Sequence, residues 1–175
     1  MPIRLNINQI MQYLPHRFPF LFIDAVEDVV PGKELRARKC VSINEMTFLG
    51  HFPDNPVVPG VLQIEAMGQC AALLGVLSGA KLDEDQSIYV TSITDCRFRK
   101  PVIPGDVMKM VARVERQRLG MWKFSCETRV NEDLVSEARI TATSGPKVRP
   151  EPLPVDLPAP TRGQRRAEPS SSKES

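Results

Sequence analysis

The sequence is poor in histidine, carries little net charge and has no long apolar run. Its 175 residues include two histidines, and a net charge of +2 gives neither the basic footprint of a nucleic-acid-binding domain nor an acidic tail. The N-terminus lacks the apolar run of a signal peptide, and no uninterrupted apolar stretch is long enough to cross a bilayer. We therefore expect a soluble, cytoplasmic protein with no nucleic-acid partner and no membrane insertion.

Cysteine is also sparse, and its four positions are scattered. Cys40, Cys70, Cys96 and Cys126 form neither the CxxC pattern of a zinc or redox site nor a dense disulfide framework. We interpret them as small buried apolar side chains in a reducing compartment.

The order of apolar periodicities predicts an α+β fold. Helical spacing appears at residues 6–14 and again from Gly60 to about Ser78. Strand-like segments rich in branched and aromatic residues cover residues 20–30, 33–43, 88–98, 107–117, 121–130 and 134–142. Two strands, one long helix and a run of hairpins predict an antiparallel sheet that wraps around the long helix. Because that helix is apolar in nearly every direction, we expect it to be buried.

The composition changes after about residue 146. Six prolines fall between positions 146 and 160, and serine, arginine and glutamate follow. Such a segment buries too little apolar surface to offset the entropy of ordering it. We predict one folded domain over residues 1–146 and an extended or disordered tail over residues 147–175.

A stiff loop and the start of the long helix bring together residues suited to proton transfer. The loop contains three prolines, carries His51 and meets the helix at Gly60, and Glu65 is the only charged residue in positions 55–80. An imidazole can take a proton from a substrate carbon near neutral pH. A carboxyl within an apolar helix resists ionisation, which raises its pKa and lets it donate a proton. The alternatives are a structural His51 and a Glu65 that is exposed or bonded to Gln69 one turn later.

The first helical turn adds a second element of the same chemistry. Its unpaired N–H groups, at Gly60 and Val61, lie at the positive end of the helix dipole and can donate to a carbonyl oxygen that gains negative charge. A glycine lets a ligand approach this backbone closely. Base, donors and acid together suit removal of a proton next to a thioester carbonyl, with loss of a group from the following carbon.

The residues in and around this region resemble a known family over about positions 8–144. They are Leu14-Pro15-His16-Arg17-Phe18-Pro19-Phe20-Leu21, Asn44-Glu45, Gly50-His51-Phe52-Pro53, Pro56, Pro59-Gly60-Val61-Leu62, Glu65-Ala66-Met67, Gln69 and the run from Phe98 to Asp106. This pattern is similar to the β-hydroxyacyl-acyl carrier protein dehydratases of bacterial type II fatty-acid synthesis. The tail after residue 146 is not part of the resemblance.

The resemblance implies a hot-dog fold and an obligate homodimer with two active sites at the subunit interface, often assembled into a hexamer as a trimer of dimers. It assigns the base to His51, the acid to Glu65 of the partner subunit, and the thioester carbonyl to the N–H of Gly60. Glutamate rather than aspartate at position 65 implies dehydration without isomerisation of the double bond. No metal and no cofactor is implied.

Further residues take roles from the same resemblance. The expected substrate is a (3R)-hydroxyacyl group on the phosphopantetheine of acyl carrier protein. The acyl tunnel is expected to involve Phe52, Val57, Val58 and Gln69. Docking of the acidic carrier is expected at Arg97, Arg99 and Lys100, for which the alternative is a solvated strand end. His16 is expected to be structural. Valine at position 58 and glycine at position 68 replace the usual methionine and alanine, which leaves the preferred chain length open.

The sequence therefore predicts a lyase that converts (3R)-hydroxyacyl-acyl carrier protein into the trans-2-enoyl thioester. A thioesterase of the same fold and a non-catalytic acyl-binding module are the rival functions. A metal site built from His16, His51 and Glu65 is a third idea, but it lacks any known ligand spacing.

Overall fold

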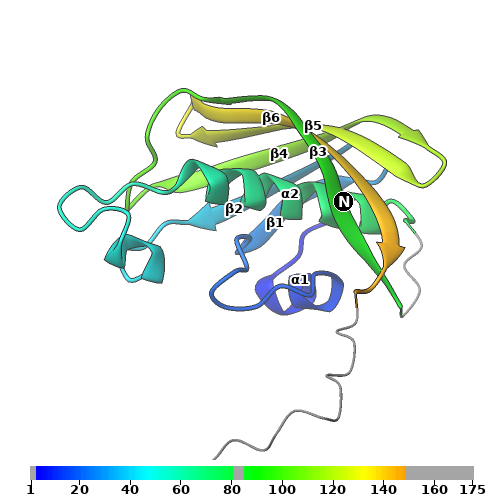
Figure 1. Cartoon of the computed structure of the whole chain (residues 1–175), viewed down its shortest axis with the longest axis horizontal. Coiled ribbons are helices and arrows are strands. Elements are labelled where there is room, and N and C mark those ends of the chain that lie inside the picture. The colour runs from blue at the N-terminus through cyan, green and yellow to red at the C-terminus, as the bar shows by residue number, and fades with distance from the viewer. Residues whose placement is uncertain (1–2, 81–84, 149–175) are drawn as a thin grey trace, which may run out of the picture.

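A six-stranded antiparallel sheet curls around one long helix in the computed structural model, which describes residues 3–80 and 85–148 (Figure 1). The strand order across the sheet is β1-β2-β4-β5-β6-β3. The elements in chain order are α1 (Ile7–Tyr13), β1 (Ala25–Val30), β2 (Glu34–Cys40), the 3₁₀ helix η1 (Met46–Leu49), α2 (Gly60–Leu77), β3 (Gln86–Phe98), β4 (Val107–Arg118), β5 (Met121–Val130) and β6 (Asp133–Pro146). The predicted α+β class and the wrapped helix are confirmed. The predicted tail lies outside the described residues from position 149 onward.

The first strand is shorter than the sequence predicts. We expected it to begin at residue 20, but β1 begins at Ala25. Two backbone groups of the preceding segment bond to a side chain instead of a neighbouring strand: Gln69 accepts from Phe22 N and donates to Phe20 O. Because these backbone groups already have hydrogen-bond partners on α2, they do not require a neighbouring strand.

Two further differences concern the last strand and the central loop. The last strand was predicted to end at Ala142, but β6 continues to Pro146 because its final residues pair with the start of β3, Gln86 opposite Pro146. The segment before α2 was predicted as a plain loop, and it contains η1.

Strand β2 shows why its residues form a half-buried strand. Leu35, Ala37 and Lys39 point inward and Arg36 and Arg38 point outward, which is the alternation of a strand with one buried face. The inward Lys39 is only 9% exposed, and its ammonium group is 3.0 Å from the carboxylate of Glu45. This ion pair makes a lysine tolerable on the apolar face of the strand.

The sheet-facing side of α2 forms the centre of the core. Ala66, Met67, Cys70, Leu73 and Leu74 are each at most 1% exposed. Burial of a side chain of the size of Met67 or Leu74 stabilises the fold by roughly 1.5–3 kcal/mol. By length and composition alone α2 could cross a membrane, but half of it is buried inside the fold, as in the core helix of a soluble protein.

The opposite side of α2 is left partly open within one chain. Val61 is 69% exposed, and Glu65, Gly68 and Ala72 are half-buried. These four residues, spaced three or four apart, lie along one side of the helix and are called the open stripe below. The expected burial of α2 is therefore incomplete along this stripe within the single chain, and the sequence did not show what would cover it.

Strand β3 forms one edge of the sheet and adjoins the open stripe. It pairs with β6 and with no other strand of the described chain. Its side chains Val90, Ile93 and Phe98 are 49%, 44% and 50% exposed. A Cβ atom added to Gly68 would lie 4.0 Å from a methyl group of Val90. An exposed apolar strand edge and an exposed helix stripe thus form one continuous surface.

The cysteines are all free, and they differ in burial. Cys70 and Cys126 are buried, Cys96 is half-buried and Cys40 is exposed. The predicted burial is wrong for Cys40, because this residue follows the inward Lys39 and so points outward. Burial raises the pKa of Cys70 and raises that of Cys126 to about 12.

Candidate active site

His51 lies in the loop between η1 and α2, in an orientation that leaves one ring nitrogen free. Its backbone N–H donates to Thr47 O at 3.0 Å, and its ring stacks on Phe52 with centroids 4.1 Å apart. The ring Nδ1 is 2.7 Å from Val57 O. A carbonyl oxygen only accepts, so Nδ1 carries the hydrogen and the neutral ring has an unprotonated Nε2. Nε2 makes no hydrogen bond within the described residues, and it is available as a base.

The first turn of α2 presents two backbone N–H groups without internal partners. The N–H groups of Leu62 and Gln63 bond to Pro59 O, whereas those of Gly60 and Val61 bond to no atom of the described chain. The free groups and the helix dipole together favour a developing negative charge at this point.

Glycine at position 60 has a packing reason as well. A Cβ atom added there would lie 2.8 Å from the ring of Phe98 on β3, which is closer than such contacts occur. The absence of a side chain therefore lets Phe98 lie directly against the first turn of α2.

Glu65 follows one turn later on the open stripe, with its side chain 32% exposed. Its Oε1 accepts from Gln69 Nε2 at 2.9 Å, so the helical pairing that the sequence left open is present. His16 Nε2 lies 3.5 Å from the same oxygen. One carboxyl oxygen of Glu65, Oε1, is therefore contacted by residues of its own chain.

The structure brings Glu65 together with His16, not with His51. No hydrogen bond or ion pair joins His51 to Glu65 in residues 3–80 and 85–148. The sequence analysis placed His16 beside Glu65 only in the idea of a metal site, because 49 positions separate them and no periodicity links a connector to a helix. The described part of the chain contains no group of three or more His, Cys, Asp or Glu side chains placed to hold a metal ion.

The four expected tunnel residues occupy two places. Phe52 and Val57 contact His51, and Phe52 is 52% exposed. Val58 follows them in the same loop and is buried, with its N–H bonded to Val102 O at 2.8 Å. Gln69 lies behind Glu65 on α2 and is 1% exposed. Its amide is already bonded on both sides, to Phe20 and Phe22 as well as Glu65.

The three cations expected to dock the carrier protein are not equivalent. Arg99 lies 2.5 Å from the carboxylate of Glu137, and Lys100 lies 2.8 Å from that of Asp133. Arg97 makes no ion pair in the described part of the chain. It faces a polar cavity of about 420 Å³ on the outside of the sheet.

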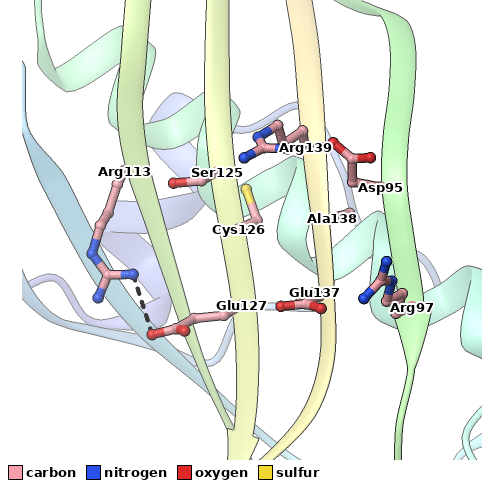
Figure 2. A pocket seen from close by; sticks show the side chains of 9 residues that line it. All are labelled: Asp95, Arg97, Arg113, Ser125, Cys126, Glu127, Glu137, Ala138 and Arg139. Atoms are coloured by element: carbon pink, nitrogen blue, oxygen red, sulfur yellow. Dashed lines mark hydrogen bonds and ion pairs between the residues drawn. The ribbon is translucent and has the colours of Figure 1, made fainter.

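This outer cavity is separate from the candidate active site. Figure 2 shows its charged side chains on β3, β4, β5 and β6, with α2 behind the strands. Arg113 forms ion pairs with Glu34 and Glu127, and Arg139 pairs with Asp95 and Glu115. These pairs are typical of a solvated sheet face.

An apolar hollow lies closer to the site. It has a volume of about 570 Å³ and lies between α1, the segment before β1, the segment that leads into η1 and the first turn of α2. Its lining includes Phe18, Phe20, Leu21, Phe22, Met46 and Leu62.

Solved structures identify the class of fold. An antiparallel sheet wrapped around one helix is the hot-dog fold, and the chain shares it with the dehydratase heterocomplex ApeI:P from Xenorhabdus doucetiae (TM-score 0.65, 17% identity, 84% of this chain and 93% of that one). It also shares it with a thioesterase from Haemophilus influenzae (TM-score 0.53, 17% identity, 80% of this chain and 85% of that one). Likeness at such identities defines the fold alone.

Sequence relatives define the family. The FabA-like domain family matches residues 14–139. The 3-hydroxyacyl-[acyl-carrier-protein] dehydratase FabZ of Polynucleobacter asymbioticus is 47% identical over 140 residues, which cover 80% of this chain and 93% of the relative. FabZ of Dechloromonas aromatica is 44% identical over 140 residues, covering 78% and 95%. The chain belongs to the FabZ family of 3-hydroxyacyl-[acyl-carrier-protein] dehydratases. The resemblance seen in the sequence and the lyase class are confirmed.

Proposed function

We propose that this enzyme removes water from (3R)-hydroxyacyl groups on acyl carrier protein and forms the trans-2-enoyl thioester during fatty-acid elongation in the cytoplasm. The observation that carries the proposal is the orientation of His51. Val57 O fixes the hydrogen on Nδ1, which leaves a basic Nε2 on the loop that leads to the free N–H groups at the start of α2. No metal or redox cofactor takes part in the proposed reaction.

The reaction is a 1,2-elimination in which each group has one role. His51 Nε2 removes a proton from C2 of the acyl chain, and the thioester oxygen gains negative charge. The N–H groups of Gly60 and Val61 donate to that oxygen. Glu65 gives a proton to the hydroxyl on C3, directly or through a water molecule, as the C–O bond breaks. The products are water and an enoyl group with a new bond between C2 and C3.

We propose that the two reacting side chains come from different chains. His51 and Glu65 do not bond within one chain, and Glu65 lies on the open stripe beside the free edge of β3. A second copy that pairs its β3 with this edge would complete the sheet and cover the stripe. Such a two-fold pairing brings Glu65 of each chain toward the active-site loop of the other. The resemblance further suggests a hexamer formed from three such dimers.

Of the three candidate docking cations, Arg97 has the clearest electrostatic reason to attract an acidic carrier protein. Arg99 and Lys100 are already paired with carboxylates of their own chain, whereas Arg97 forms no ion pair within residues 3–80 and 85–148. We propose Arg97 as the first contact of the carrier and the two paired residues as weaker contributors.

The test of the proposed function identifies the product. The enzyme is incubated with 3-hydroxydecanoyl-acyl carrier protein, and the carrier is analysed by mass spectrometry. We expect a carrier-bound enoyl group, lighter by one water, and a loss of about 10²–10⁴-fold in rate for His51→Ala because the general base is removed. Free carrier thiol would indicate the thioesterase instead. Full activity of His51→Ala would contradict the proposed mechanism.

A further inference from the structure

Gln69 is fully engaged in hydrogen bonds at the centre of the site. It is 1% exposed and lies one helical turn after Glu65 on α2. Its Oε1 accepts from Phe22 N at 2.8 Å, and its Nε2 donates to Phe20 O at 2.7 Å and to Glu65 Oε1 at 2.9 Å. One side chain thus joins the segment before β1 to the candidate acid.

The two backbone contacts fix the orientation of this amide. The N–H of Phe22 can only donate, and the carbonyl of Phe20 can only accept, so the oxygen and nitrogen of Gln69 cannot exchange places. The second N–H of Nε2 is the group that remains for Glu65. Gln69 therefore always presents a donor to Glu65 and never an acceptor.

A donor in this position makes the two oxygens of Glu65 unequal. Because Oε1 accepts from Gln69, a proton on the carboxyl group belongs on Oε2. His16 also approaches Oε1, although 3.5 Å is longer than a good hydrogen bond. Oε2 makes no hydrogen bond within the described residues. It is the oxygen left to face a substrate.

We propose that Gln69 is a positioning residue for the dehydration: it anchors Oε1 of Glu65 and so makes Oε2 the oxygen that carries and delivers the proton. This inference rests on the proposed function, in which Glu65 is the acid. Gln69 itself does not touch the reacting atoms, and its effect passes through the carboxyl group of Glu65.

The same helix offers a matched control. Gln63 is also buried, 3% exposed, but its Oε1 has no hydrogen-bond partner in the described chain. Replacing either glutamine by methionine removes an amide of the same length from the same helix. Only one of the two replacements removes a bond to Glu65.

The experiment is a double-mutant cycle. Gln69→Met and Gln63→Met are made in the wild-type enzyme and in Glu65→Gln, and kcat and KM are measured with carrier-bound substrate. We expect Gln69→Met to lower kcat about 10- to 100-fold with little change in KM, because a hydrogen bond to a carboxyl group is lost. Gln63→Met should change kcat by less than about twofold. In Glu65→Gln, which has no acid proton to place, Gln69→Met should cost less than about twofold.

The outcomes separate positioning from general support of the fold. An equal loss in both backgrounds would overturn the proposal, because a purely structural role does not depend on the acid. An unchanged kcat in Gln69→Met would overturn it as well. Full activity of Glu65→Gln would instead refute the proposed function.

A measurement on the wild-type enzyme covers the case in which Gln69→Met fails to fold. Neutron diffraction from crystals acid enough to protonate Glu65 should show the deuterium on Oε2. A deuterium on Oε1 would overturn the proposal.

Discussion

The two sides of α2 differ in what completes them. The sheet-facing side, centred on Met67 and Leu74, is buried by residues of its own chain. The open stripe adjoins a free strand edge and carries Glu65. One side of α2 is thus fully buried in the core of the chain, and the other side is a partly exposed surface that carries the candidate acid. The difference predicts that substitutions on the first side act on stability and those on the second act on activity and assembly.

The largest expected effect is at Glu65. Glu65→Gln keeps the size of the side chain and removes the acid, so we expect a loss of about 10²–10⁴-fold in kcat. Thermal unfolding should stay near that of the wild type, because the side chain is partly exposed and the carbonyl of the new glutamine can still accept from Gln69 Nε2. A large drop in thermal stability would mean that Glu65, on the open stripe, also stabilises the fold of the single chain.

Assembly should fail when the open stripe is charged and enlarged. Gly68→Arg places a long cation where a second chain is expected to pack, so we expect monomers in analytical ultracentrifugation and loss of most of the activity. Gly68→Ala is the matched control, because a Cβ atom there meets only a methyl group of Val90 at 4.0 Å. An intact, active dimer of the Gly68→Arg variant would show that the open stripe is not part of the interface.

The sheet-facing side should respond in the opposite way. Met67→Ala leaves a cavity in a fully buried position and should cost about 2–5 kcal/mol in the free energy of unfolding. Urea unfolding at matched protein concentration measures this cost, and kcat per folded enzyme should change by less than about threefold. A selective loss of kcat without loss of stability would contradict the division between the two sides.

The smallest expected effect concerns the buried thiol of Cys126. Burial raises its pKa to about 12 from an ordinary value of 9.0, so the unfolded chain loses the thiol proton first as pH rises. Its contribution to stability is present below about pH 9 and is lost between about pH 9 and 12. Between about pH 8 and 10.5 the wild type should lose about 1–2 kcal/mol more than Cys126→Ala. Equal losses in urea unfolding of the two proteins would show that this thiol does not contribute.

Much of the fold could be predicted because the relevant signals are local. The bounds of α2 and β5 follow from apolar periodicity and from the residues that end it. His51, Gly60 and Glu65 were selected because few residue types perform proton transfer and these fall around one helix start.

The remaining features depend on contacts between distant positions. Phe20 and Phe22 look like strand residues, but Gln69 satisfies their backbone, and no pattern within the segment reports a partner on another element. The approach of His16 to Glu65 has the same origin. The sequence could not reveal the open stripe, because a helix that is covered by a second chain is as apolar as a helix that is covered by residues of its own chain.

The central claim is that each active site takes His51 from one chain and Glu65 from another. Its most direct test is to co-express His51→Ala and Glu65→Gln in equal amounts and to measure dehydration by the mixed population. If chains pair at random, about a quarter of the sites combine an intact His51 with an intact Glu65 from the other chain, so activity should recover to about a quarter of the wild type. No recovery, in a population shown by mass spectrometry to contain mixed dimers, would contradict the shared site.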